Sequence, residues 1–236
     1  MRKMIIERAA AMGIDMSADQ AAKFEQFHEM LVLANARMNL TRVPDDRDEA
    51  IDRNYLDSIA PLAHGLPAGA RSLIDIGAGA GFPGIPLAIM RPDIEITLLD
   101  SLGKRVAFMR EAIQTLGLNA RAEHLRAEDA GRKPGMREGY DIAVARAVAR
   151  IRVLAELALP LVRVGGAMIA YKGPAWTEEL EEAQNAIRIL GGRFERAAPA
   201  PIPGRDWAHT LIDIKKQSPT PHAYPRRAGI PEKKPI

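Results

Sequence analysis

A glycine-rich turn is the part of the sequence most suited to chemistry. An apolar run over 72–76 leads into Gly77-Ala78-Gly79-Ala80-Gly81-Phe82-Pro83-Gly84. Glycine lets a chain turn tightly and lets a ligand approach the bare backbone. Asp75 stands two residues before the first glycine, which gives the pattern Asp-x-Gly-x-Gly-x-Gly. This pattern is typical of S-adenosylmethionine sites, where the methionine moiety needs room beside the backbone.

A second interpretation of the same turn is a dinucleotide site. Gly79-x-Gly81-x-x-Gly84 matches the G-x-G-x-x-G pattern of dinucleotide-binding proteins. The apolar run ends at Ile76, so the turn begins at Gly77, and this register favours S-adenosylmethionine. An NAD-dependent oxidoreductase remains an alternative, although we find no acid–base pair for hydride transfer after the fourth apolar run. Titration with each cofactor separates the two hypotheses.

Two further apolar runs end in groups that suit a nucleoside. Asp100 follows the run over 94–99, and its carboxylate can accept hydrogen bonds from both ribose hydroxyls. Asp100 could instead cap a helix over 101–116. The third run ends near Leu125–Asp129, where a backbone N–H and a carboxylate could bind adenine.

The fourth and fifth apolar runs end in basic residues. Arg146 follows the run over 141–145, and Lys172 follows the run over 167–171. Arg146 suits a role in positioning the cofactor or the acceptor, or else a surface ion pair with Glu128 or Asp129. Lys172 suits substrate binding or a solvated surface. The five histidines show no ligand spacing, so we expect no metal site.

The residue types limit the kinds of methyl transfer. The chain has no cysteine, which excludes the nucleophile for methylation at pyrimidine C5 and the cluster ligands of radical enzymes. The Asn-Pro-Pro-Tyr motif of amine-methylating enzymes is absent after the fourth run. The remaining acceptors are an atom with a free lone pair, which needs only alignment, and a hydroxyl.

The elements that must position these residues alternate along the chain. Alternating strands and helices predict a parallel sheet covered on both faces. The last two runs follow each other without a helix, so they are expected to pair antiparallel. The predicted fold is a Rossmann-like class I S-adenosylmethionine methyltransferase with a mostly parallel, seven-stranded sheet. The strands are expected at 72–76, 94–99, 120–125, 141–145, 167–171, 192–197 and 210–214, and the helices between them at 84–90, 102–116, 149–162 and 176–190.

Length and composition set the frame for this fold. The chain has 236 residues, 47% of them hydrophobic, and carries a net charge of +3. We expect a helical segment over 1–65 and a methyltransferase domain over 66–236, with an extended tail at 217–236. Residues 205–236 hold seven Lys or Arg residues against three Asp or Glu, which suits phosphate binding or a soluble surface. No apolar run is long enough to span a bilayer and no signal peptide is visible, so we expect a cytoplasmic protein without a membrane partner. Nothing in the sequence suggests an obligate dimer, so we expect a monomer.

Several motifs together resemble one known family. They are Met38-Asn39-Leu40-Thr41, Leu56-Asp57-Ser58, the glycine turn through Pro86, Leu99–Arg105, Arg146-Ala147 and Tyr224–Pro231. The chain resembles the GidB/RsmG-type methyltransferases, which modify guanine N7 in small-subunit ribosomal RNA. The resemblance implies cofactor contacts from Gly77, Phe82, Ala127, Glu128 and Arg146. The family usually has His where this chain has Asn54, and an aromatic residue where it has Met38.

The implied substrate agrees with the chemistry of the residues. Guanine N7 carries a lone pair and no proton, and A-form RNA hides it, so the target is expected in an unpaired loop. We hypothesise that Arg146 contacts the cofactor and donates to guanine O6. The expected RNA contacts are Asn39, Lys172, Arg226 and Arg227, with phosphates also bound by Arg37, Arg42, Lys233 and Lys234. Alternatives are a methyltransferase for a protein or small molecule and a non-catalytic nucleic-acid-binding module.

Overall fold

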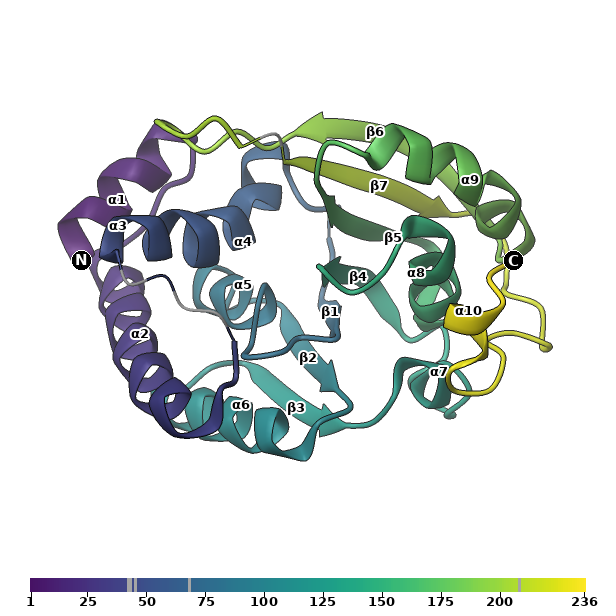
Figure 1. Ribbon diagram of the computed structural model, residues 1–236, viewed down its shortest axis with the longest axis horizontal. Helices are drawn as coiled ribbons and strands as arrows, with labels where there is room; N and C mark the ends of the chain where they lie inside the picture. The colour runs from purple at the N-terminus through teal and green to yellow at the C-terminus, as the bar shows by residue number, and fades with distance from the viewer. Residues whose placement is uncertain (42–43, 45, 68, 208) are drawn as a thin grey trace.

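The computed structural model describes residues 1–41, 44, 46–67, 69–207 and 209–236, and it is built around one seven-stranded sheet (Figure 1). The strand order is β3-β2-β1-β4-β5-β7-β6. Neighbours from β3 to β5 are parallel, whereas β7 runs antiparallel to both β5 and β6. This order confirms the predicted class I methyltransferase fold. The strands are β1 (Ser72–Ile76), β2 (Glu95–Asp100), β3 (Ala120–His124), β4 (Tyr140–Arg146), β5 (Val162–Lys172), β6 (Gly192–Pro199) and β7 (Thr210–Lys216).

The helices lie on both faces of the sheet, as Figure 1 shows. The first group of helical elements is α1 (Arg2–Ala11), α2 (Ala18–Met38), α3 (Arg47–Ala50), η1 (Ile51–Leu56), α4 (Asp57–Ile59), η2 (Ala60–His64), α5 (Gly84–Met90) and α6 (Gly103–Leu116). The second group is α7 (Ala127–Ala130), α8 (Ile151–Ala158), η3 (Leu159–Leu161), α9 (Trp176–Ile189) and α10 (Ile230–Lys233). None of the helices in the described part of the chain combines the length and apolar character that crossing a bilayer requires.

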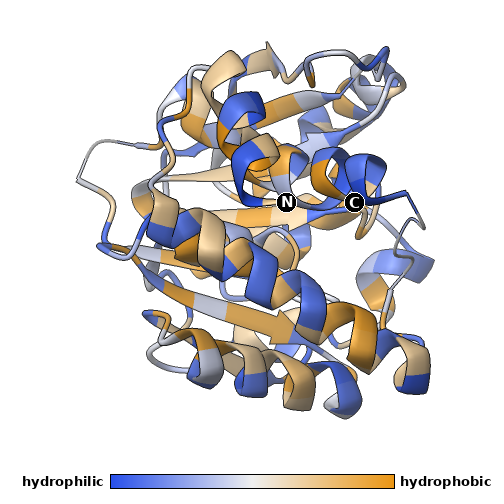
Figure 2. Cartoon of the chain, turned by 90° about the vertical axis from the view of Figure 1, so that its left-hand side faces the viewer, coloured by the Kyte–Doolittle hydropathy of each residue, from blue (hydrophilic) through white to orange (hydrophobic). Residues whose placement is uncertain are grey.

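Alternating side chains of each strand enter two separate cores. Leu73 and Val144 point to the core shared with the first group of helices, whereas Ile74 and Ala143 point to the core shared with the second. In Figure 2 the central strands are mostly apolar, and the outer helices alternate apolar and polar residues. Burial on both faces explains why the parallel strands read as nearly continuous apolar runs.

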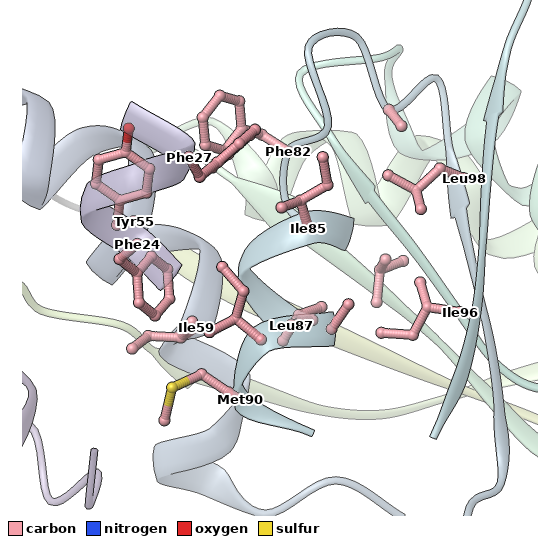
Figure 3. Packing of buried hydrophobic residues seen from close by; sticks show 14 of the residues in the cluster. Phe24, Phe27, Tyr55, Ile59, Phe82, Ile85, Leu87, Met90, Ile96 and Leu98 are labelled. Carbon is pink, nitrogen blue, oxygen red and sulfur yellow. The ribbon is translucent and has the colours of Figure 1, made fainter. Parts of the chain in front are cut away.

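The N-terminal helices belong to the first of these cores. Phe24 and Phe27 of α2 pack against Tyr55 of η1, and Phe27 and Tyr55 also contact Phe82 of the glycine turn (Figure 3). All four rings are almost fully buried. Each buried aromatic side chain contributes about 1.5–3 kcal/mol of transfer free energy, so these helices and the glycine turn stabilise each other.

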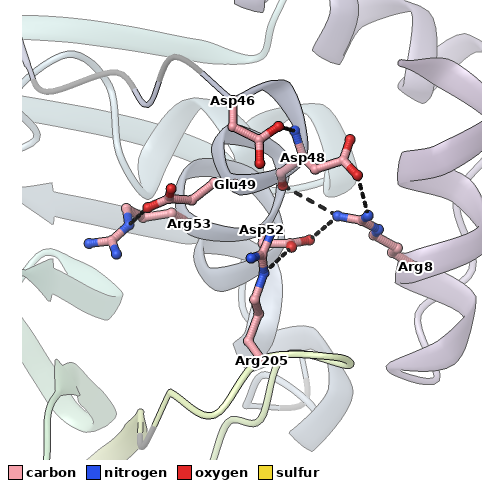
Figure 4. A network of polar contacts seen from close by, with 7 residues as sticks. All are labelled: Arg8, Asp46, Asp48, Glu49, Asp52, Arg53 and Arg205. Atoms are coloured by element: carbon pink, nitrogen blue, oxygen red, sulfur yellow. Dashed lines mark hydrogen bonds and ion pairs between the residues drawn. The ribbon is translucent and has the colours of Figure 1, made fainter.

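Within the helical segment predicted over 1–65, residues 47–64 form one run with changing hydrogen bonding. It passes from α3 through the π-helical η1 to α4 and the 3₁₀-helical η2, where Pro61 stands near the start. Asp52 of η1 is 1% exposed and accepts hydrogen bonds from Arg8 Nη1 and Arg205 Nε, both at 2.7 Å (Figure 4). These two arginines compensate a buried charge and tie η1 to α1 and to the segment before β7.

The tail predicted to be extended is instead folded onto α7 and α8. Arg226 makes several hydrogen bonds to Glu156 of α8, including one from its main-chain N–H at 2.8 Å. Arg137 donates to the carbonyls of Thr220 and Tyr224. The prediction was wrong because Pro and charge favour an exposed segment, whereas the buried Glu156 carboxylate requires a partner from a distant part of the chain.

Candidate active site

Four of the eight predicted cofactor residues meet at the carboxyl ends of β1, β2 and β3. A cavity of about 190 Å³ there, called the first cavity below, is lined by Gly77, Asp100, Ala127 and Glu128. In a parallel sheet these ends share one edge, so groups far apart in sequence converge there.

The glycine turn has a backbone that other residues rarely adopt. Gly77 has φ +66° and Gly81 has φ +99°. A Cβ atom on Gly77 would lie 3.0 Å from Cγ2 of Val148, which lines the first cavity. A Cβ atom on Gly81 would overlap the side chain of Ile85. Gly79, Gly81 and Phe82 are not among the residues that line this cavity; they shape the turn.

Asp75 holds this turn from inside the protein. Its carboxylate is fully buried, and Oδ2 accepts a hydrogen bond from Gly84 N at 2.7 Å. Oδ1 has no hydrogen-bond partner among the described residues. Burial raises the pKa of Asp75 to about 7, although the Gly84 bond and the charge of Arg146 oppose the shift. The carboxyl group is therefore partly protonated near neutral pH.

This shift predicts a pH-dependent effect of Asp75→Asn on stability without cofactor. The folded state keeps a proton that the unfolded state releases, so wild-type stability falls as pH rises from about 4 to beyond 7. Asn has no such proton. The variant should exceed the wild type by up to about 4 kcal/mol at pH 8, with the difference vanishing towards pH 4.

Urea unfolding between pH 4 and pH 8 measures this difference. Asp141→Asn is the control of opposite sign, because hydrogen bonds from Arg71, Ser72 and Arg163 outweigh burial and lower the pKa of Asp141 to about 2. That variant should be less stable than the wild type at pH 6 and should approach it as pH falls from about 4 to 2. An Asp75→Asn effect that does not vary with pH contradicts the assignment.

Asp100 contacts both the glycine turn and the start of α6. Its Oδ2 accepts from Gly79 N at 2.9 Å and its Oδ1 from Leu102 N at 2.8 Å, and the residue is 4% exposed. Arg105 Nη1 lies 3.6 Å from Oδ2. The capping role considered from the sequence is not present, because α6 begins at Gly103 after Leu102 and has no side-chain cap. The Asp100 carboxylate instead lines the first cavity.

The C-terminal segment closes the first cavity beside Glu128. Glu128 Oε1 accepts a hydrogen bond from Gly229 N at 2.8 Å, and Pro231 and Glu232 line the cavity beside it. Sequence reasoning missed Pro231 and Glu232 as lining residues. Proline and charge in a terminal segment give no sign of which groove that segment will occupy.

A second cavity has a volume of about 440 Å³ and takes part of its lining from residues next to those that line the first. Arg146 and Ala147 line the second cavity, whereas Val148 and Ala149 line the first. These four consecutive residues, which begin with the last residue of β4, are called the wall between the two cavities below. A methyl donor in the first cavity and an acceptor in the second would meet at this wall.

Arg146 is held in place at the wall by three contacts. Its Nη1 donates to Asp57 Oδ2 at 2.8 Å and to the Arg53 carbonyl at 3.0 Å, and its guanidinium lies 5.2 Å from the Phe82 ring centroid. The ion pair considered from the sequence exists, but its partner is Asp57 and not Glu128 or Asp129. These contacts use only some of the five N–H donors of the guanidinium.

Asp57 joins Arg146 to His209, a residue that the sequence did not single out. His209 Nδ1 lies 2.7 Å from Asp57 Oδ1. Burial favours the neutral form of Asp57, but hydrogen bonds and charges from His209 and Arg146 lower its pKa overall. The hydrogen bond to Asp57 raises the pKa of His209. Asp57 belongs to the Leu56-Asp57-Ser58 motif, which is the sequence signal for it, whereas an isolated histidine gives none.

The residues expected to bind RNA lie in different surroundings. Lys172 lines the second cavity, and its Nζ contacts the Ala149 carbonyl at 2.6 Å and Glu179 Oε2 at 2.7 Å. Asn39 ends α2 in the left-handed region and is exposed, as is Arg227. Arg226 is paired with Glu156. Arg37, Lys233 and Lys234 are exposed, and Arg42 lies outside the described residues.

Arg226 and Arg227 are neighbours with different expected roles. Arg226→Ala removes the charged partner of the buried Glu156 carboxylate and leaves it the main-chain N–H of residue 226, so we expect a loss of about 3–5 kcal/mol of stability. Arg227→Ala, the matched control, should leave stability within about 0.5 kcal/mol, because the side chain is exposed. Thermal unfolding of both variants measures the difference. Equal stability of the two contradicts the structural role of Arg226.

The comparisons with known proteins agree with this geometry. A family model described as "rRNA small subunit methyltransferase G" matches residues 20–198. The chain is 42% identical over 237 residues to a "Ribosomal RNA small subunit methyltransferase G" of Lactobacillus johnsonii, covering 99% of each chain. It is 44% identical to a protein of the same name from Clostridium beijerinckii, covering 99% of this chain and 98% of that protein.

Solved structures with low sequence identity share the fold. The "cofactor-bound Rv0187 from MTB" matches with a TM-score of 0.56 at 17% identity, covering 82% of this chain and 91% of that one. "P. horikoshii TYW2 in complex with MeSAdo" matches with a TM-score of 0.51 at 14% identity, covering 73% and 64%. The family match and the full-length relatives show that the chain belongs to the GidB family, rRNA small subunit methyltransferase G.

Proposed function

We propose that the protein transfers a methyl group from S-adenosylmethionine to N7 of a guanine in an unpaired loop of small-subunit ribosomal RNA. Its family makes it a methyltransferase that uses S-adenosylmethionine, and the acceptor atom is the part inferred here. The observation that carries the proposal is the position of Arg146 on the wall between the two cavities.

The first cavity offers suitable groups for each part of the cofactor. Gly77 presents backbone without a side chain, Asp100 presents a carboxylate for the ribose, and Ala127 and Glu128 present a main-chain N–H and a carboxylate for adenine. When bound, S-adenosylmethionine supplies a methyl group that leaves its sulfonium sulfur as the lone pair of an acceptor attacks. Because guanine N7 has no proton to lose, the protein needs to align the acceptor and needs no general base.

Arg146 suits the task of alignment. Asp57 and the Arg53 carbonyl fix one end of the guanidinium, which leaves further N–H donors for a base in the second cavity. Donation to guanine O6 orients the base and leaves N7 free. The target base leaves its stack to enter the cavity, as in other enzymes that modify bases.

The exposed basic residues supply phosphate contacts in this proposal. Arg37, Arg227, Lys233 and Lys234 carry no compensating ion pair to the described residues within 4 Å, and affinity for RNA should therefore fall as salt rises. Asn39 and Lys172 complete the proposed contacts. We also propose that the protein acts as a monomer in the cytoplasm, where its ribosomal substrate is located.

Mapping methylated guanines in ribosomal RNA by mass spectrometry tests the function. RNA from cells that lack the protein should miss one 7-methylguanosine that is present in the wild type. Purified protein with S-adenosylmethionine should restore it, on free RNA or on small subunits. An unchanged set of methylated guanines would refute the proposal and favour a methyltransferase acting on a protein or small molecule.

A further inference from the structure

One side chain in the second cavity has an unused hydrogen-bonding group. Asn54 lies in the π-helical η1, lines the cavity and is 5% exposed. Its Nδ2 is buried and has no hydrogen-bond partner among the described residues. Leaving such a donor unpaired costs about 1–3 kcal/mol, which points to a ligand that completes it. π-Helical turns are also frequent at functional sites.

The other polar side chains around Asn54 already have partners. Asp57 is bound by Arg146 and His209. Tyr171 donates its hydroxyl to the Ser58 carbonyl at 2.6 Å, and Lys172 is paired with Glu179. Within the described lining of this cavity, Asn54 therefore offers a buried, unpaired side-chain donor in addition to the free N–H groups of Arg146.

The chemistry of an amide suits one edge of guanine. Guanine carries the acceptor O6 next to the donor N1–H, and an amide carries a donor next to an acceptor, so the two can form a pair of hydrogen bonds. Adenine presents a donor and an acceptor in the opposite order, so it could pair with the amide only if the amide were turned by 180°. Enzymes that extrude a base commonly recognise this edge. The arrangement leaves N7 on the other edge.

We propose that Asn54 selects guanine in the second cavity by pairing with O6 and N1–H, which rests on the proposed function. Arg146 at the wall then orients the N7 side, and Asn54 the opposite side. The two hydrogen bonds from Asn54 predict which base analogues the enzyme accepts. Inosine keeps O6 and N1–H and should react like guanine. 2-Aminopurine keeps N7 but lacks both groups and should react about 10- to 100-fold more slowly.

The test measures kcat/KM on small subunits reconstituted with guanine, inosine or 2-aminopurine at the mapped position. In Asn54→Ala the preference for guanine over 2-aminopurine should shrink about tenfold, whereas the Kd for S-adenosylmethionine stays unchanged because Asn54 lies outside the first cavity. Asn54→Asp, which keeps the shape but loses the donor, should lose the same preference. Asn119→Ala, an exposed amide that bonds the Pro92 carbonyl, is the matched control and should keep it.

The outcomes separate this inference from the function on which it rests. If the wild type methylates guanine N7 and both Asn54 variants keep its preference, the role of Asn54 is wrong and the function stands. If the wild type methylates 2-aminopurine as fast as guanine, the role of Asn54 is also wrong and the function stands. If the wild type places no methyl group on guanine N7, the proposed function itself fails. Thermal unfolding shows that each variant is folded at the assay temperature.

Discussion

Replacing Arg146 with alanine is expected to lower kcat/KM for methyl transfer by about 100- to 1000-fold, the usual loss when an aligned donor is removed from an active site. Arg146 stands where the first and second cavities meet, and its guanidinium is fixed by Asp57 and the Arg53 carbonyl. Steady-state transfer from labelled S-adenosylmethionine to small subunits measures the loss.

Arg146→Ala is also expected to lower stability, so a control variant must separate lost stability from lost methyl transfer. Removing Arg146 leaves the buried Asp57 with His209 as its remaining side-chain hydrogen-bond partner, at a cost of about 3 kcal/mol. Arg146→Lys keeps the charge beside Asp57 but not the planar set of donors. It should therefore recover most of the stability and little of the activity. Arg150→Ala, which removes a surface ion pair with Glu178 and Glu182, should leave activity unchanged.

Two results would contradict this role. Methyl transfer at the wild-type rate in folded Arg146→Ala would show that the donor is not needed. Full activity in Arg146→Lys would show that a positive charge suffices and that the planar set of guanidinium donors is not needed.

Replacing Asp100 with alanine is expected to weaken S-adenosylmethionine binding by about 100-fold. The carboxylate lines the first cavity and also holds Gly79 N and Leu102 N. Its loss removes the proposed ribose acceptor and loosens the turn, and a hydrogen bond to a charged group contributes about 1.5–3 kcal/mol. Isothermal titration with S-adenosylmethionine measures the Kd.

The pattern of kinetic constants distinguishes binding from catalysis. Because Asp100 is not in the second cavity, kcat at saturating cofactor should stay within a few-fold of the wild type while the KM for cofactor rises. Asp93→Ala, an exposed carboxylate paired with Arg91, is the matched control and should bind the cofactor normally. An unchanged Kd in Asp100→Ala would place the ribose elsewhere.

Local patterns predicted the strands and the residues at their ends. Ile74, Val144 and their neighbours are apolar because the strands are buried on both faces, and this leaves runs that can be recognised without the fold. Glycines at positive φ mark the turn after β1 in the same way, since few other residues adopt that backbone. Parallel pairing then places Gly77, Asp100 and Ala127 along one edge, which explains why the first cavity was predictable.

Contacts between distant residues were decided only by the tertiary structure. Asp57 meets Arg146 across 89 positions and His209 across 152, and Gly229 meets Glu128 across 101. Each contact gives a buried charge or N–H a hydrogen-bond partner. Many other residues of the same sequence could serve as that partner equally well. Periodicity and propensity describe a residue relative to its near neighbours. The choice of distant partner, and with it the second cavity and the position of the tail, depends on how whole elements pack.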